Sequence, residues 1–201
     1  RYGIPVACAA DGPSGIRMEN GKTATQLPIG TLLACSFNIP MMEELYVLEG
    51  EELVENQIDT LLGPGVNIHR YPLNGRNFEY FSEDPYLISE MAVQVIEGIE
   101  SSDVGACVKH FAVNNQETER NWVNVEIDER TLREIYLPAF EAAVKKAKVR
   151  SIMGAYNLFR GVHCCENNEL LGEILRKEWN YDGLILSLIH ISEPTRPRLI
   201  S

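Results

Sequence analysis

The sequence predicts an α/β fold, an incomplete (β/α)8 TIM barrel of about six βα units, and two observations predict it. Short apolar runs typical of buried strands alternate with longer stretches of helical periodicity. Most of these runs are followed by polar, glycine-rich segments, as in the loops that form the C-terminal face of such barrels. A doubly wound sheet is the alternative, but neither GxGxxG nor a phosphate-binding loop follows any run. Six strands are fewer than the eight that close a barrel.

Six apolar runs are the strand candidates. They span residues 4–9, 32–36, 60–62, 106–109, 151–154 and 183–186. Because helical stretches separate most of them, we expect a parallel sheet with right-handed crossovers.

Four helices are expected between these strands. Pro40 stands at a first-turn position in "PMMEELYVL", and Asp84 and Pro85 provide an N-cap and a first helical residue for the second helix. The third, "DERTLREIYLPAFEAAVKKAK", contains Pro138, which predicts a kink because proline has no amide hydrogen to donate. The fourth is "NNELLGEILRKEW", whose leucine and isoleucine residues recur at helical spacing.

Composition excludes several classes of partner. The chain has 201 residues, 45% hydrophobic and 23% charged, with a net charge of −11. No basic cluster occurs outside residues 145–150, which argues against nucleic acid and anionic membranes as partners. No apolar run approaches the roughly 20 residues of a membrane span. Since the chain begins with Arg1, we expect the native N-terminus to be missing, so that a lost signal stays open and a cytoplasmic location is only slightly favoured.

The cysteines indicate neither a disulfide framework nor a zinc site. None of them forms a CxxC pair or a spacing typical of zinc ligands. Cys8 and Cys107 lie in strand-like runs, where a free cysteine is usually a small core residue. We therefore expect reduced, structural thiols at all five positions, which are Cys8, Cys35, Cys107, Cys164 and Cys165.

Several polar side chains follow successive strands. Asp11 follows the first run, Arg76 lies in the long loop after 60–62, Lys109 and His110 end the run at 106–109, and Tyr156 follows 151–154. A carboxylate, several donors and an aromatic ring in one pocket suit a sugar. Its hydroxyl groups donate and accept hydrogen bonds, and its apolar ring face packs on aromatic rings.

Each of these residues also has a purely structural interpretation. Asp11 in "DGP" is a strong turn signal, and Arg76 has Glu79 and Glu83 within pairing range in the sequence. Adjacent residues of a strand face opposite ways, so the pair Lys109 and His110 is a weak signal by itself. Only the joint placement after successive strands favours a site.

Four long strings make the resemblance specific. "DGPSGIR", "LLGPGVNIHRYPLNGRNFEYFSEDPYL", "CVKHFAVNNQETER" and "SIMGAYNLFRGV" resemble glycoside hydrolase family 3, in its β-glucosidase branch, and the match covers residues 1–185. This resemblance implies a barrel domain followed by an α/β sandwich domain. It also implies retaining hydrolysis of a β-linked oligosaccharide or glucoside, with neither metal nor organic cofactor.

The resemblance also implies roles for particular residues. Asp11 resembles the carboxylate that binds sugar hydroxyls in the subsite for the cleaved sugar residue. The residues that resemble the hydrogen-bond donors and the walls of this subsite are Arg76, Lys109, His110, Met153 and Tyr156. The loop "KHFAVNNQ" differs from the "KHFPGHG"-like loop of the β-N-acetylglucosaminidases in this family. The difference favours the glucosidase type, whose acid/base is a glutamate of the second domain.

The nucleophilic aspartate expected from the family is missing here, by truncation or by replacement. The sixth strand of the family reads like "GFVVSDW", whereas this chain has "GLILS" followed by Leu188. The string at 186–196, "LSLIHISEPTR", resembles the translation of a sequencing-library adapter. We therefore expect residues 1–186 to be a partial barrel domain and 187–201 a non-native tail, with a divergent natural tail as the alternative.

Three hypotheses for function follow. The first is a fragment of a β-glucosidase, inactive as it stands because the nucleophile and the C-terminal α/β sandwich domain are missing. The second is a sugar-binding pseudoenzyme of the same fold. The third is a phosphate-binding barrel, for which no glycine-rich phosphate loop is visible.

Overall fold

Five parallel strands form the main sheet of the chain. The structure, a computed structural model, describes residues 3, 6–18 and 20–187. The strands lie side by side in the order β1 (Ala9–Asp11), β2 (Thr60–Leu62), β3 (Gly105–Phe111), β5 (Ser151–Gly154) and β8 (Leu184–Leu186). Their order in space follows their order along the chain, which is the winding of a barrel, whereas a doubly wound sheet reverses direction. The predicted class, an incomplete (β/α)8 barrel, is confirmed.

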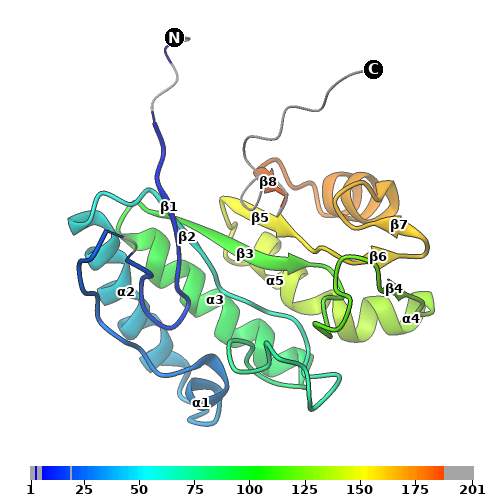
Figure 1. Cartoon of the computed structure of the whole chain (residues 1–201), viewed down its shortest axis with the longest axis horizontal. Helices are drawn as coiled ribbons and strands as arrows, with labels where there is room; N and C mark the ends of the chain where they lie inside the picture. Colours follow the sequence, from blue (N-terminus) through cyan, green and yellow to red (C-terminus); the bar gives the residue numbers. More distant parts are fainter. Residues whose placement is uncertain (1–2, 4–5, 19, 188–201) are drawn as a thin grey trace.

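The three longer α-helices cover one face of this sheet (Figure 1). They are α2 (Ile39–Glu55), α3 (Pro85–Ser101) and α5 (Pro138–Lys145), and α3 packs against both of the others. The predicted N-cap of α3 is confirmed, since the Asp84 side chain accepts from the amide of Tyr86 at 2.9 Å. An apolar stripe of α3 is buried against the core and consists of Ile88, Met91, Ala92, Val95 and Ile99.

Pro138 interrupts a helix, as predicted. The stretch before it consists of α4 (Glu129–Thr131) and a π-helical segment, η1 (Leu132–Tyr136), and α5 starts at the proline itself. The amide of Leu137 donates to the carbonyl of Leu132 at 3.0 Å, one residue further back than in an α-helix. The fourth predicted helix is also π-helical, η2 (Glu169–Glu178).

A small second sheet links the loops that follow β3 and β5. It consists of β4 (Asn124–Val125), β6 (Leu158–Phe159) and β7 (Val162–His163), in that order. Sequence patterns predicted no strands here, because two-residue strands are too short to show a period.

The strand predicted at 32–36 is wrong. This segment overlaps a short helix, α1 (Gly30–Ala34), in which the consecutive residues Leu33 and Ala34 are both buried. A strand would turn one of them away from the core. Gly30 permits the close packing, because a Cβ there would lie 2.5 Å from the carbonyl oxygen of Glu79. The described sheet therefore has five strands rather than six.

Two further expectations concern the ends of the chain. The strand predicted at 4–9 overlaps β1 only at Ala9, and positions 4 and 5 lie outside the described residues. Leu188 and the rest of the expected tail lie outside the described residues.

The two cysteines predicted for the core differ in burial. Cys8 precedes β1 and is exposed, so its predicted place in the core is wrong, whereas Cys107 inside β3 is buried.

Candidate functional site

A cavity of about 610 Å³ opens where the carboxyl ends of the strands meet. Asp11 ends β1 and Leu62 ends β2, while Lys109 and His110 come from β3 and Met153 from β5. Side chains from successive strands converge here because parallel strands all point the same way. All six residues predicted for the site line this cavity: Asp11, Arg76, Lys109, His110, Met153 and Tyr156.

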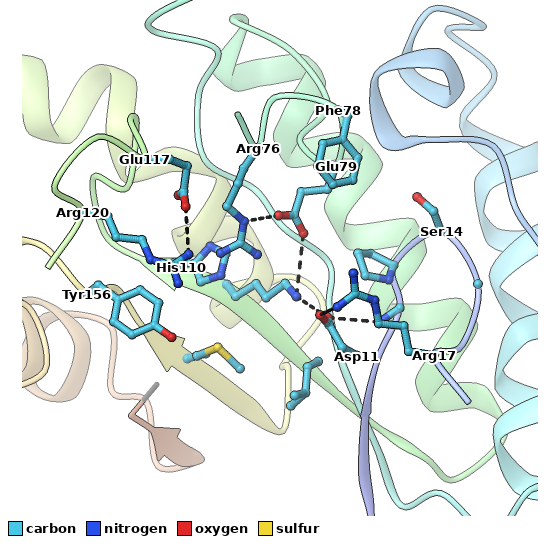
Figure 2. A pocket seen from close by; sticks show the side chains of 16 residues that line it. Asp11, Ser14, Arg17, Arg76, Phe78, Glu79, His110, Glu117, Arg120 and Tyr156 are labelled. Atoms are coloured by element: carbon cyan, nitrogen blue, oxygen red, sulfur yellow. Dashed lines mark hydrogen bonds and ion pairs between the residues drawn. The ribbon is translucent and has the colours of Figure 1, made fainter. Parts of the chain in front are cut away.

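Four side chains of alternating charge cross the floor of the cavity (Figure 2). Lys109 Nζ lies 2.6 Å from Asp11 Oδ1 and 3.7 Å from Glu79 Oε2. Glu79 also pairs with Arg76 through Oε1. The side chains of Lys109 and Glu79 are only 3% and 5% exposed. Because each charge has an opposite neighbour, the cations stay fixed in a site shielded from water.

Asp11 is held in its ionised form. Burial raises the pKa of its carboxyl group, but the charge and hydrogen bond of Lys109 outweigh burial, with smaller help from Arg17 and the amide of Gly12, and the pKa lies below its usual value. The side chain is still 37% exposed toward the cavity. Asp11 is therefore an anionic hydrogen-bond acceptor at neutral pH, which suits hydroxyl donors.

His110 is neutral and its tautomer is fixed. Burial, followed by the positive charges of Arg76, Lys109 and Arg120, holds the pKa of the imidazole well below its usual value. Asn114 Nδ2 donates to the Tyr80 hydroxyl at 3.1 Å, and that hydroxyl lies 3.0 Å from His110 Nδ1. Burial raises the pKa of Tyr80, so the hydroxyl stays protonated and donates a hydrogen bond to Nδ1. The ring hydrogen of His110 is therefore on Nε2.

Adjacent residues of a regular strand face opposite ways, yet Lys109 and His110 both line the cavity. The pairing of β3 with β5 shifts register between Lys109 and Phe111, so the strand is irregular at this point. Asn67 clamps this irregular backbone. Its amide group donates to the carbonyl of His110 at 3.0 Å and accepts from the amide of His110 at 2.9 Å.

The opposite wall is apolar and aromatic. Met153 packs with Leu62 and Cys107, and Tyr156 extends this cluster. The guanidinium carbon of Arg120 lies 4.5 Å from the centre of the Tyr156 ring. Charged donors on the floor and an apolar wall beside them give the cavity two chemically different sides.

Sequence reasoning missed four charged residues of the cavity. Glu79 was considered only as a surface partner of Arg76, whereas Arg17, Glu117 and Arg120 were not considered for the site, although all four line it. A signal existed for two of them. Glu117 and Arg120 are three residues apart in the loop after β3, and they form an ion pair of 2.8 Å.

The described part of the chain has neither a cluster of metal-binding side chains nor a helix that could span a membrane. Within residues 3, 6–18 and 20–187, no three histidine, cysteine or acidic side chains gather where a metal ion would need them. None of the helices described is long and apolar enough to cross a membrane.

Comparison with solved structures gives close matches in fold and sequence. A β-glucosidase from Paenibacillus barengoltzii is 60% identical, with a TM-score of 0.91 over 92% of this chain and 20% of that one. β-Glucosidase 3B from Thermotoga neapolitana, in complex with glucose, is 48% identical, with a TM-score of 0.88 over 92% of this chain and 27% of that one.

Comparison of sequences likewise matches the chain to β-glucosidases. A β-glucosidase of Ruminococcus albus is 50% identical over 92% of this chain and 20% of its own length, so the chain spans about a fifth of that relative. Thermostable β-glucosidase B of Acetivibrio thermocellus is 49% identical over 93% of this chain and 26% of its own length. Residues 1–192 match the family described as the glycosyl hydrolase family 3 N terminal domain. The chain therefore belongs to glycosyl hydrolase family 3 and carries its N-terminal, barrel-type domain.

Proposed function

We propose that the cavity binds the terminal, non-reducing β-D-glucosyl residue of an oligosaccharide or glucoside, as part of a retaining β-glucosidase. The observation that carries the proposal is the fixed array of Asp11, Lys109, Glu79 and Arg76 beside the apolar wall of Met153 and Tyr156. Asp11 accepts from sugar hydroxyls, while Lys109, Arg76 and His110 Nε2 donate to them. The Thermotoga neapolitana relative in complex with glucose supports this choice of ligand.

The described cavity is suited to binding rather than to acid catalysis. Retaining hydrolysis needs two carboxyl groups about 5–5.5 Å apart, one of which protonates the leaving group. The cavity has three carboxyl groups, and each is paired with a cation: Asp11 with Lys109, Glu79 with Arg76, and Glu117 with Arg120. The lowered pKa of Asp11 makes it a poor proton donor. We infer that the reacting carboxylates of the complete enzyme lie elsewhere, with the nucleophile at the position of Leu188.

An L-arabinopyranosyl residue is the second candidate for the sugar that the cavity binds. An exo-α-(1→6)-L-arabinopyranosidase of Bifidobacterium longum is 44% identical over 92% of this chain and 26% of its own length. Competition between L-arabinose and D-glucose separates the two candidates.

Glucose binding by the 201-residue chain tests the proposal, and ligand-observed NMR measures it. Asp11→Asn should weaken binding at least about tenfold, because a charge-assisted hydrogen bond contributes about 1.5–3 kcal/mol and about 1.4 kcal/mol is tenfold in affinity. Asp59→Asn is the matched control, since Asp59 lies outside this cavity and accepts from the amide of Cys8. Equal glucose binding by Asp11→Asn and the unaltered chain would refute the proposal.

Assays of hydrolysis test the inference that the nucleophile of the complete enzyme lies at the position of Leu188. We expect no release of phenol from an aryl β-glucoside above a buffer control, either by this chain or by Leu188→Asp alone, because an acid/base carboxyl is still required. A chimera with Asp at 188 and the corresponding remainder of the Paenibacillus barengoltzii β-glucosidase should be active. Turnover by the purified 201-residue chain would show that the nucleophile has been assigned to the wrong position.

A further inference from the structure

Phe78 is an apolar side chain at the edge of an otherwise charged region of the cavity. It lines the cavity and is 53% exposed, whereas Lys109 and His110 on the floor are 2% and 1% exposed. Figure 2 shows its ring above Glu79, on the side of the cavity away from Tyr156 and Arg120. Phe78 therefore lies at the rim, further from the floor than the residues proposed to hold the sugar.

The backbone on both sides of Phe78 is tightly held. Thr31 Oγ1 lies 2.8 Å from the carbonyl oxygen of Asn77 and 2.9 Å from that of Tyr80, and the amide of Thr31 donates to the carbonyl of Phe78 at 3.4 Å. The amide of Glu79 donates to the carbonyl of Arg76 at 3.2 Å. The phenyl ring is thus presented from a fixed position and not from a loose loop.

The core does not account for this exposed ring. The ring pairs of the described residues do not include Phe78, and more than half of the side chain faces water. Other aromatic residues are more exposed than Phe78, but they do not line the cavity: Phe37, Tyr86 and Trp122. An exposed ring at the mouth of a polar cavity is placed to be covered by a ligand.

We infer that Phe78 is the platform for the leaving group of the substrate, which therefore carries a ring with a flat apolar face. This inference rests on the proposed function and deepens it. With the glucosyl residue on the floor against Asp11 and Lys109, the leaving group extends toward the rim. An aryl ring, or the carbon–hydrogen face of a second sugar, then stacks on the phenyl ring.

Binding of matched glucosides by the 201-residue chain tests this platform. The ligands are methyl β-glucoside, which has no ring in the leaving group, phenyl β-glucoside and cellobiose, each measured by ligand-observed NMR. We expect the chain to bind the ring-bearing ligands about fivefold more tightly than methyl β-glucoside, or about 1 kcal/mol at ~1.4 kcal/mol per tenfold. Phenyl β-glucoside and cellobiose separate an aromatic from a sugar leaving group.

Phe78→Ala should abolish this preference while leaving the affinity for methyl β-glucoside unchanged, and Phe78→Trp should keep the preference. Phe37→Ala is the matched control, since Phe37 is 71% exposed and outside the cavity. An unchanged preference in Phe78→Ala, or no preference in the unaltered chain that binds methyl β-glucoside, refutes the platform alone. Failure of the unaltered chain to bind methyl β-glucoside refutes the proposed sugar site and the platform with it.

Discussion

Replacement of Glu79 by glutamine should destabilise the chain strongly, although the two side chains have nearly the same shape. Glu79 is the anion between two cations, Arg76 and Lys109, whose side chains are 19% and 3% exposed. Burial lowers the pKa of Arg76, but the charge and hydrogen bond of Glu79, together with Tyr80 and Glu117, outweigh burial and raise the pKa above its usual value. Without that charge, Arg76 loses its ion pair and Lys109 depends on Asp11 alone.

The expected cost is about 3 kcal/mol of unfolding free energy. Removing one partner of a buried ion pair typically costs about 3–5 kcal/mol, and we take the lower end because Lys109 keeps its 2.6 Å contact with Asp11. Urea denaturation at pH 7, followed by far-UV circular dichroism and linear extrapolation, measures this free energy. Glucose binding should weaken in the same variant, because Arg76 and Lys109 are no longer held toward the cavity.

Glu117→Gln is the matched control for this substitution. Glu117 pairs with Arg120 in the same cavity, but the two side chains are 24% and 40% exposed, so the loss should stay below about 1 kcal/mol. A loss for Glu79→Gln no larger than that of the control would refute the reasoning that burial makes the Glu79 pairs indispensable.

Three further predictions concern titration and hydrogen bonding. Glucose binding should stay constant from pH 8 down to about pH 5 and fall only in more acid solution, because the pKa of Asp11 is below its usual value; an NMR titration with a midpoint near pH 6 would contradict this. Tyr80→Phe should lower the unfolding free energy by about 1–3 kcal/mol in urea denaturation, since His110 Nδ1 and Asn114 both lose a hydrogen-bond partner; a loss near zero would show that these two buried hydrogen bonds do not stabilise the fold. Burial, followed by the charge of Glu52, raises the pKa of Glu49 from 4.5 to about 8. The folded chain therefore keeps a proton that the unfolded chain releases, so this contribution to stability is complete below pH 4.5 and lost as the pH rises through 8. Glu49→Gln should remove that dependence, and parallel stability curves of the two proteins between pH 5 and 8.5 would show that Glu49 does not cause it.

The placement of the main site residues follows from the sequence. Asp11 and Lys109 stand at the ends of runs whose apolar character predicts buried strands, and both line the cavity. The carboxyl ends of parallel strands meet at one edge whatever the exact register, so a strand–helix alternation is enough to bring such residues together. Local sequence signals also predicted the Asp84 cap and the kink at Pro138, because both features depend only on neighbouring residues.

Other features depended on contacts between segments distant in sequence. Residues 32–36 are apolar enough for a strand, but the segment overlaps a helix whose first residue, Gly30, packs closely against the backbone of Glu79. A short apolar run carries no period that distinguishes the two structures. Glu79 likewise reads as a surface partner of Arg76, because nothing in the loop sequence shows that Lys109 lies 3.7 Å away.

The sequence by itself thus determined the fold class, the family and the six residues predicted to line the cavity. The tertiary structure alone decided the charge states and the orientation of those residues: the ionised Asp11, the neutral His110 with hydrogen on Nε2, and the cations Lys109 and Arg76, which both pair with Glu79. The physical reason is that periodicity is a property of neighbours along the chain. Electrostatic energy instead depends on burial and on distances that exist only after the strands lie side by side.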